Sequence, residues 1–171
     1  MARWFVLPVV LACLAGAAAP AAAKIMRFQQ QGETAFVYHI PDDWTANREI
    51  DSGAETLRGP GPGGGLIALA IVGDGRTLAD IGASCITSAG GTPVAPQRTL
   101  TVSGKEALYY VEPGVSGGTL DMKLLVVRVD ATHVGMAMEL TSPHATPEQD
   151  AVADAVVDSI RVSPPDMSFG S

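Results

Sequence analysis

The residue pattern with the best-known chemistry is a serine in a glycine-rich segment. The pentapeptide centred on Ser116 reads Gly-Val-Ser-Gly-Gly, which matches the G-x-S-x-G pattern around the nucleophile of many serine hydrolases. Acids and histidines follow in the order that a triad needs, with Asp121 or Asp130 before His133 or His144. Such a nucleophile requires a strand before it and a helix after it, whereas the residues after this pentapeptide predict a strand. The pattern therefore favours a plain glycine loop, and a Ser116 hydrolase is kept as an outside hypothesis.

The three histidines do not predict a metal site. His39 lies in a predicted strand, His133 opens another strand, and His144 lies in a loop, without the paired spacing of metal ligands. No helical pair of carboxylates suggests acid–base catalysis, and the glycine tract at 59–65 lacks the Gly-Lys-Ser/Thr ending of a phosphate loop. We therefore predict no catalytic residue, no metal and no cofactor.

A turn with two acids and a tryptophan is the candidate binding surface. Asp42, Asp43 and Trp44 directly follow a predicted strand. With His39, the two acids could contact a cation, although an Asp-rich segment is more often simply a turn. Trp44 can be read as a ligand platform or, more simply, as a packing lid over the edge of a sheet. Both interpretations of this surface stay open.

The N-terminus predicts a secretory signal peptide. Arg3 supplies a positive charge, residues 4–14 are apolar, and the small residues Ala21 to Ala23 offer a cleavage site before Lys24. Proline and glycine interrupt the apolar run before it reaches the ~20 residues that cross a bilayer. We expect residues 1–23 to be a leader, and residues 24–171 to form one domain in the periplasm or outside the cell that does not span the membrane.

The two cysteines bear on this localisation. Cys13 follows Val-Leu-Ala and loosely resembles the site at which bacterial lipoproteins are cut and acylated, so a lipid anchor at Cys13 is the alternative to a free domain. If Cys13 leaves with the leader, Cys85 is the remaining cysteine and no internal disulfide forms. Cys85 lies on the inward stripe of a predicted helix, which favours a small core residue over a nucleophile.

The charge balance excludes nucleic acid as the expected partner. The formal net charge is −7, and no cluster of Lys and Arg interleaved with aromatic residues is present. Binding to a phosphate backbone depends on several basic side chains on one face. The spread acidity fits solubility first and a basic protein partner second.

Periodic patterns predict mainly antiparallel strands. Strands are expected at 35–41, 55–58 and 66–72, and hairpins at 98–102 with 106–111 and at 121–129 with 133–140. The segments 59–65 and 113–118 are read as loops. In the last strand, Val134, Met136, Met138 and Leu140 share one face, and Met122 is read with them as core.

Two helices are expected. Thr77 can cap the first, whose inward residues would be Leu78, Ile81, Cys85 and Ala89. Thr146 followed by proline, with glutamine three residues on, is a strong start for the second, whose inward residues would be Val152, Ala155, Val156 and Ile160. Strands, a helix, more antiparallel strands and a helix predict an α+β domain around an antiparallel sheet.

Short motifs at both ends of this domain resemble a known family. The segment Phe36 to Trp44 reads FVYHIPDDW, and Val156 to Val162 reads VVDSIRV. They resemble the PsbP-like superfamily, which includes the Mog-type Ran-binding proteins and the DcrB-like bacterial envelope proteins; Asp43 stands where that family usually has glycine. The resemblance implies an α/β/α sandwich around an antiparallel sheet, used for binding and assembly, with no shared catalytic residues.

Two functional hypotheses follow. The first is an exported, non-catalytic envelope protein that binds another envelope or secreted protein as an accessory module. The alternative is a periplasmic module that holds a small ligand or lipid in an apolar pocket between sheet and helix.

Overall fold

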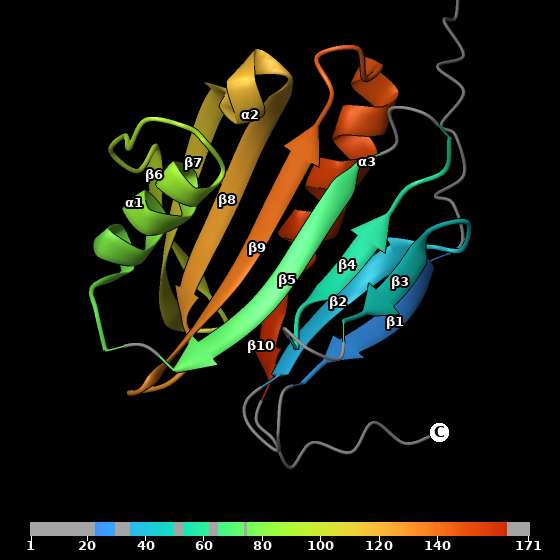
Figure 1. The fold of residues 1–171 in the computed structure, drawn as a ribbon. Helices are drawn as coiled ribbons and strands as arrows, with labels where there is room; N and C mark the ends of the chain where they lie inside the picture. Colours follow the sequence, from blue (N-terminus) through green and yellow to red (C-terminus); the bar gives the residue numbers. More distant parts are fainter. Residues whose placement is uncertain (1–22, 30–34, 50–52, 62–64, 74, 164–171) are drawn as a thin grey trace, which may run out of the picture.

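Two antiparallel sheets form the framework of the protein (Figure 1). The computed structural model describes residues 23–29, 35–49, 53–61, 65–73 and 75–163, so most of the predicted leader, with Cys13, lies outside the described residues. The larger sheet has the strand order β3 (Thr45–Arg48), β4 (Glu55–Arg58), β5 (Leu66–Gly73), β9 (His133–Thr141), β8 (Leu120–Arg128), β7 (Lys105–Gly114) and β6 (Arg98–Val102). The smaller sheet has the order β1 (Ala23–Phe28), β2 (Ala35–Pro41) and β10 (Arg161–Ser163).

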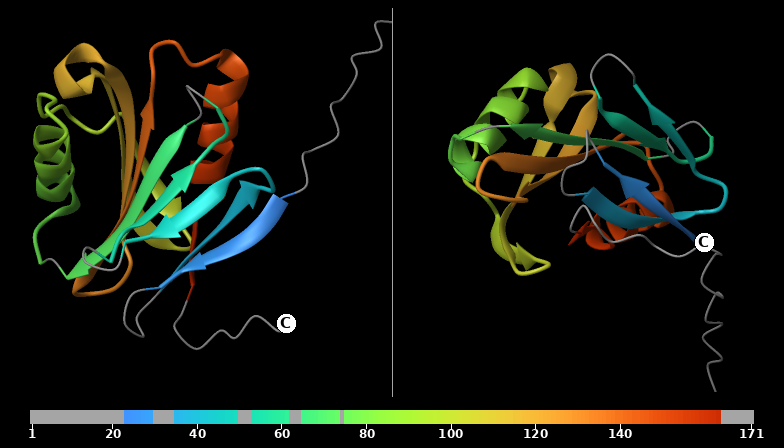
Figure 2. Two further views of the ribbon diagram at one scale, coloured as in Figure 1. Left: turned by 45° about the vertical axis from the view of Figure 1, so that its right-hand side comes forward. Right: turned by 90° about the horizontal axis from the view of Figure 1, so that it is seen from below.

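Both faces of the larger sheet are covered. Helix α1 (Leu78–Ser88) packs on β7 and β8, whereas α3 (Pro147–Asp158) packs on β9 and on β2 of the smaller sheet. Figures 1 and 2 show the two helices on opposite sides of the larger sheet. A short helix, α2 (Val115–Gly118), joins β7 to β8. This arrangement confirms the predicted α+β fold with helices on either side of an antiparallel sheet. No helix among the described residues has the length and apolar character needed to cross a membrane.

The central strand β9 shows why two cores form. Val134 and the half-buried Met136 face α1, as the alternation predicts. The opposite face carries Gly135, Ala137 and Glu139, and it lies against α3 and the smaller sheet, where Ala137 and Glu139 are almost completely buried. Side chains on alternate residues point to opposite faces of a strand, so β9 contributes to both cores.

The smaller sheet packs on the larger one through an aromatic ring that requires glycine. Phe36 on β2 is completely buried. A Cβ atom built on Gly135 would lie 2.1 Å from Cζ of Phe36, far inside van der Waals contact. Glycine at this position therefore sets how closely the two sheets approach.

A second link between the sheets is polar. The Tyr38 hydroxyl on β2 donates a hydrogen bond to the Glu55 carboxylate on β4, and both residues are buried. Burial, together with the neighbouring Glu55, raises the pKa of Tyr38 far above its usual range. Tyr38 therefore stays protonated and satisfies a carboxylate that would otherwise be buried without a partner.

Helix α3 begins and ends with side-chain caps. Thr146 accepts a hydrogen bond from the Gln149 backbone, and the Gln149 side chain accepts one from the Thr146 backbone, which is the predicted capping box. At the other end, the Ser159 hydroxyl accepts a hydrogen bond from the His39 backbone N–H at 2.8 Å. The Ser-Ile pair of the C-terminal motif thus ties α3 to β2, and Ile160 enters the core.

The capping box gives a direct test of how much the start of α3 matters. We expect Thr146→Ala to lower the free energy of unfolding by about 1 kcal/mol, since one N-terminal N–H loses its acceptor. Chemical denaturation of the wild type, Thr146→Ala, Gln149→Ala and the double variant measures this. Each single variant removes one of two separate side-chain–backbone hydrogen bonds, so the two single effects should add to about the double effect; no loss of stability in either single variant would show that the box contributes nothing.

The inward face of α3 differs from the prediction at two positions. Val156 and Ile160 are buried as predicted, whereas Val152 and Ala155 are exposed and Ala153 and Val157 are buried in their place. The helix is rich in Ala and Val around its whole circumference, so the sequence could not fix its rotation about its axis. The correction places Val152 on the surface, beside the site described below.

Several short elements were not predicted. Strands β1, β3 and β10 and helix α2 were missed, and residues 113–118, expected to be a loop, belong to the end of β7 and to α2. The strand β3 is polar and exposed at the edge of the sheet, and β10 has three residues, so neither gives a periodic signal.

Candidate functional site

The turn at Trp44 forms one wall of a surface pocket. The Trp44 backbone N–H donates a hydrogen bond to the Pro41 carbonyl at 3.0 Å, which closes the turn. Lys24 on β1 donates its side-chain hydrogen bonds to the carbonyls of Asp42 at 3.2 Å and Trp44 at 2.9 Å. The turn is therefore held from both sides, and the Trp44 side chain, 4% exposed, is fixed in position.

Two glycines form the floor beneath the indole. Gly59 donates a backbone hydrogen bond to the Gly65 carbonyl at 3.0 Å, which closes the connection between β4 and β5. A Cβ atom on Gly59 would lie 3.0 Å from the Trp44 ring, and one on Gly65 would lie 2.8 Å from Cβ of Ala153. The glycine-rich tract thus allows the Trp44 ring and α3 to pack directly on the backbone.

The first two turns of α3 complete the pocket. Its volume is about 240 Å³, and its lining is formed by Pro41, Asp43, Trp44, Gly59, Pro60, Gly65, Glu148, Gln149 and Val152. We call this the Trp44 pocket. The buried residues Trp44, Gly59 and Gly65 make an apolar floor, and the exposed Asp43 and Glu148 lie at its mouth.

The mouth of the Trp44 pocket is acidic. Hydrogen bonds from its own backbone and from Thr146 lower the pKa of Glu148, so this carboxylate is ionised at neutral pH. None of the lining residues is Lys, Arg or His. Within the part of the chain that the structure describes, neither Asp43 nor Glu148 takes part in an ion pair.

The sequence-predicted surface coincides with this pocket in two of its three residues. Asp43 and Trp44 line the pocket, whereas Asp42 contributes its backbone carbonyl to Lys24 and does not line it. Trp44 is the packing lid that the simpler interpretation predicted, and it also borders the cavity. Sequence reasoning missed Glu148, Gln149 and Val152, although the capping box was the signal that placed the start of α3.

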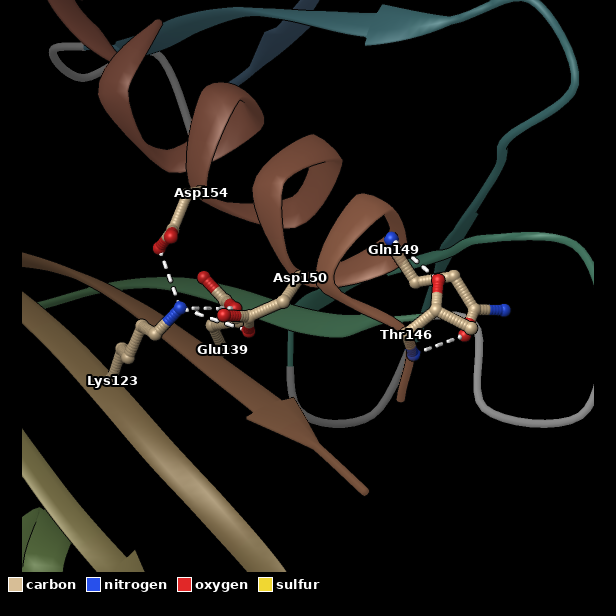
Figure 3. Close-up of polar contacts among 6 residues, drawn as sticks. All are labelled: Lys123, Glu139, Thr146, Gln149, Asp150 and Asp154. Atoms are coloured by element: carbon tan, nitrogen blue, oxygen red, sulfur yellow. Dashed lines mark hydrogen bonds and ion pairs between the residues drawn. The ribbon is translucent and has the colours of Figure 1, made fainter. Parts of the chain in front are cut away.

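A partly buried charge cluster fixes α3 on the sheet. Lys123 on β8 places its ammonium Nζ 3.4 Å from Oε1 of Glu139, 2.9 Å from Oδ1 of Asp150 and 2.7 Å from Oδ1 of Asp154 (Figure 3). Asp150 and Asp154 are four residues apart on one face of the helix. A single ammonium therefore joins three carboxylates from two elements and fixes the part of α3 that borders the Trp44 pocket.

The protonation states in this cluster differ from those of free side chains. Burial, opposed by Lys123 and reinforced by Asp154, raises the pKa of Glu139 to about 7. Burial alone would lower the pKa of Lys123, but its hydrogen bonds to Asp154 and Asp150 outweigh this and raise it above its usual range. Oε2 of Glu139 is buried without a hydrogen-bond partner, which is consistent with a carboxyl that favours its neutral form.

The Ser116 segment lacks the geometry of a nucleophile elbow. Ser116 lies in α2 between two antiparallel strands, in a left-handed conformation with φ 55°. The Asp121 carboxylate accepts a hydrogen bond from the Gly114 backbone at 3.0 Å, and His133 lies at the far end of β8 and β9. In the described residues no hydrogen bond joins the Ser116 hydroxyl to a histidine.

The side chains of His133 and Cys85 contact neighbouring residues of the fold. Nδ1 of His133 lies 3.0 Å from both carboxylate oxygens of Asp130 in the turn between β8 and β9. Burial opposes the change, but the hydrogen bonds from Thr132 and His133 together outweigh it and lower the pKa of Asp130 to about 2. Burial raises the pKa of Cys85, whose thiol lies 3.3 Å from the Met136 sulfur. Among the described residues no group of His, Cys, Asp and Glu is arranged to hold a metal ion.

A second, apolar cavity lies beside α1. It has a volume of about 290 Å³ and is lined by Ser88, Ala89, Val115, Ser116, Leu120, Met138 and Leu140. We call it the α1 groove. It lies between the sheet and a helix, the place where the ligand-binding hypothesis expects a pocket.

Comparison with known proteins shows what the fold resembles. No protein-family model matches the sequence, and no curated protein matches it. LpqN, involved in cell envelope biogenesis of Mycobacterium tuberculosis, is 12% identical with a TM-score of 0.59, over 84% of this chain and 91% of LpqN. The cyanobacterial PsbP protein CyanoP of Synechocystis is 16% identical with a TM-score of 0.51, over 87% of this chain and 98% of CyanoP. A Bacteroides thetaiotaomicron protein is 9% identical with a TM-score of 0.49, over 82% of this chain. This chain spans about half (52%) of the length of that protein.

These likenesses concern the fold. The chain has a PsbP-like fold, as the motifs at 36–44 and 156–162 predicted. At such low identity they assign no activity.

Proposed function

We propose that the protein is an extracytoplasmic, non-catalytic accessory module that binds a partner protein through the Trp44 pocket. The pocket itself carries this proposal: it combines a rigid apolar floor, an open mouth and ionised carboxylates, the features of a small anchor site at a protein interface. The predicted leader and the likeness to an envelope-biogenesis protein support the location.

The size of the pocket favours a protein partner over a free small molecule. Sites for cofactors and drug-sized ligands usually have about 300–1,000 Å³ and enclose most of the ligand. The Trp44 pocket has about 240 Å³ and is open at one side. A cavity of this kind holds one side chain of a larger surface.

Site-specific photo-crosslinking in the native cell envelope tests this proposal. A photoreactive amino acid at Val152, an exposed wall of the pocket, should give a covalent adduct with one defined protein. The same amino acid at the exposed Lys105, on the hairpin of β6 and β7, is the matched control. Adducts of equal yield at both positions, or none at Val152, would contradict the proposal.

The α1 groove, at about 290 Å³, lies just below the range of drug-sized sites and supports a second candidate, a module that holds an apolar molecule smaller than a drug. Its lining of Ala, Val, Leu and Met side chains carries no charge. Native mass spectrometry of freshly purified protein should then show a bound mass that Met138→Asp removes and the matched change Met26→Asp, on β1, leaves. A spectrum of the bare polypeptide alone would rule this candidate out.

The outside hypothesis of a hydrolase gives a clear expectation. Ser116 lacks a hydrogen-bonded base in the described structure, so Ser116→Ala should leave the turnover of p-nitrophenyl acetate unchanged from the background rate. A loss of turnover specific to Ser116→Ala would show that the serine is a nucleophile after all.

A further inference from the structure

The Trp44 pocket has an apolar floor and an acidic mouth, and this arrangement indicates which kind of group can occupy it. The inference rests on the proposed function. The floor at Trp44, Gly59 and Gly65 is buried and apolar, and the two carboxyl side chains, Asp43 and Glu148, are exposed at the mouth. The deepest part of a group that enters the pocket contacts this apolar floor, and its outer part lies beside the carboxylates. Its inner part must therefore be apolar, and its outer part must tolerate or attract negative charge.

Among the residues that the structure describes, no basic side chain forms an ion pair with Asp43 or Glu148 at the mouth. At this turn, Lys24 directs its ammonium to the carbonyls of Asp42 and Trp44. Lys123, on the other side of α3, is held by Asp150 and Asp154. With a formal net charge of −7, the whole chain also repels acidic partners and attracts basic ones.

We propose that the pocket takes an apolar side chain of a partner protein that stands next to Lys or Arg in an exposed segment. The apolar side chain packs on Val152 and on the edge of Trp44. The neighbouring basic side chain extends over the mouth toward Asp43 and Glu148, with its aliphatic stem along Pro41 and Pro60, as long basic side chains commonly do at interfaces.

Tryptophan fluorescence offers a direct readout of occupancy. The sequence has two tryptophans, Trp4 and Trp44. In Trp4→Phe protein, Trp44 is the single tryptophan whether or not the leader is removed. Titration with an acetylated, amidated peptide that alternates leucine and arginine should change the emission of Trp44. Peptides that alternate leucine with glutamate, leucine with glutamine, and serine with arginine are the matched probes.

The expected order of affinity separates the two parts of the inference. The leucine–arginine peptide should bind about tenfold or more tightly than the leucine–glutamate peptide, and the difference should shrink in 0.5 M NaCl because salt screens exposed charges. The serine–arginine peptide should bind much more weakly than the leucine–arginine peptide. The proposal would be overturned if the leucine–glutamate peptide, or the serine–arginine peptide, bound as tightly as the leucine–arginine peptide.

Variants assign the effect to the mouth. Asp43→Asn with Glu148→Gln should weaken the leucine–arginine peptide about fivefold and leave the leucine–glutamine peptide unchanged, since two exposed ion pairs contribute little each. Asp42→Asn, in the same turn but outside the pocket lining, should change neither. An equal loss in Asp42→Asn would show that general charge, and not the mouth of the pocket, attracts the peptide.

Failure of this inference can be distinguished from failure of the proposed function. A partner that is crosslinked at Val152 through an acidic or uncharged segment would retain the proposed function and overturn this inference. Preference for the leucine–arginine peptide without any crosslinked partner would retain the inferred chemistry and overturn the proposed function.

Discussion

Gly135→Ala is expected to lower the free energy of unfolding by about 3 kcal/mol and the melting temperature by roughly 10 °C. The added Cβ would lie 2.1 Å from Cζ of Phe36, and the Phe36 ring is completely buried, so it has no free space in which to move. Either the ring leaves its position or the two sheets separate. Thermal and urea denaturation followed by circular dichroism measure the change.

Two further variants check the cause. Gly75→Ala adds the same methyl group where no atom lies within 4 Å, and it should change stability by less than about 0.5 kcal/mol. Phe36→Leu removes part of the ring, so the double variant with Gly135→Ala should be less destabilised than the sum of the two single changes. Additive effects would show that the clash with Phe36 is not the reason.

Lys123→Met is expected to have the second large effect, about 3 kcal/mol at pH 8. The substitution leaves three carboxylates facing each other, of which Glu139 is fully buried and Asp150 and Asp154 are each 43% exposed. The exposure of the two aspartates keeps the loss below that of a wholly buried network. Lys105→Met, at an exposed lysine, is the control and should be nearly neutral.

The effect of Lys123→Met should depend on pH in a defined direction. At pH 5 Glu139 binds a proton in the folded state, because its pKa is about 7. One negative charge then disappears from the cluster, and the loss of Lys123 should be smaller by 1 kcal/mol or more. A destabilisation that is equal at pH 5 and pH 8 would contradict the assignment of Glu139 as the titrating group.

Glu139→Gln tests the same titration by removing the titrating carboxyl itself. The pKa of Glu139 is higher in the folded state, about 7, than its ordinary value of 4.5. The stability that this proton contributes is therefore fully present below pH 4.5 and is lost as the pH rises through 7. Unfolding free energies at pH 5 and pH 8 should show a smaller fall in Glu139→Gln than in the wild type, whereas parallel curves would place the titration elsewhere.

The sequence was informative where a pattern repeats within a few residues. The alternation in β2 and β9, the apolar run in β5 and the capping box at Thr146 predicted strands and a helix that the structure confirms, because these signals depend on neighbours along the chain. The exposed edge strand β3 and the three-residue β10 depend on pairing with distant strands and could not be found in this way.

The partly buried charge cluster could not be predicted from the sequence. Lys123 and Glu139 are 16 residues apart, and Asp154 is 31 residues from Lys123. Each of the strand residues alternates with apolar neighbours and would be placed on a solvated face. Helix α3 covers that face, so both faces of β8 and β9 are buried even though the polar residues alternate with apolar ones. Asp43 and Trp44, which line the Trp44 pocket, could be named from the sequence because they are adjacent in it, and their role in binding stays a prediction.

The order of strands in the larger sheet has a consequence for how the chain folds during synthesis. Strand β5 lies between β4 and β9, and β9 is the neighbour with which it forms the longer register, from Leu66 with Leu140 to Gly73 with His133. A ribosome releases β5 long before β9, so the apolar β5 remains an open edge until most of the polypeptide has been made. Assembly of the central sheet must therefore come late and be slow, as expected for pairing between distant segments, and a nascent chain that is held unfolded until it is complete avoids the aggregation to which such an edge would lead.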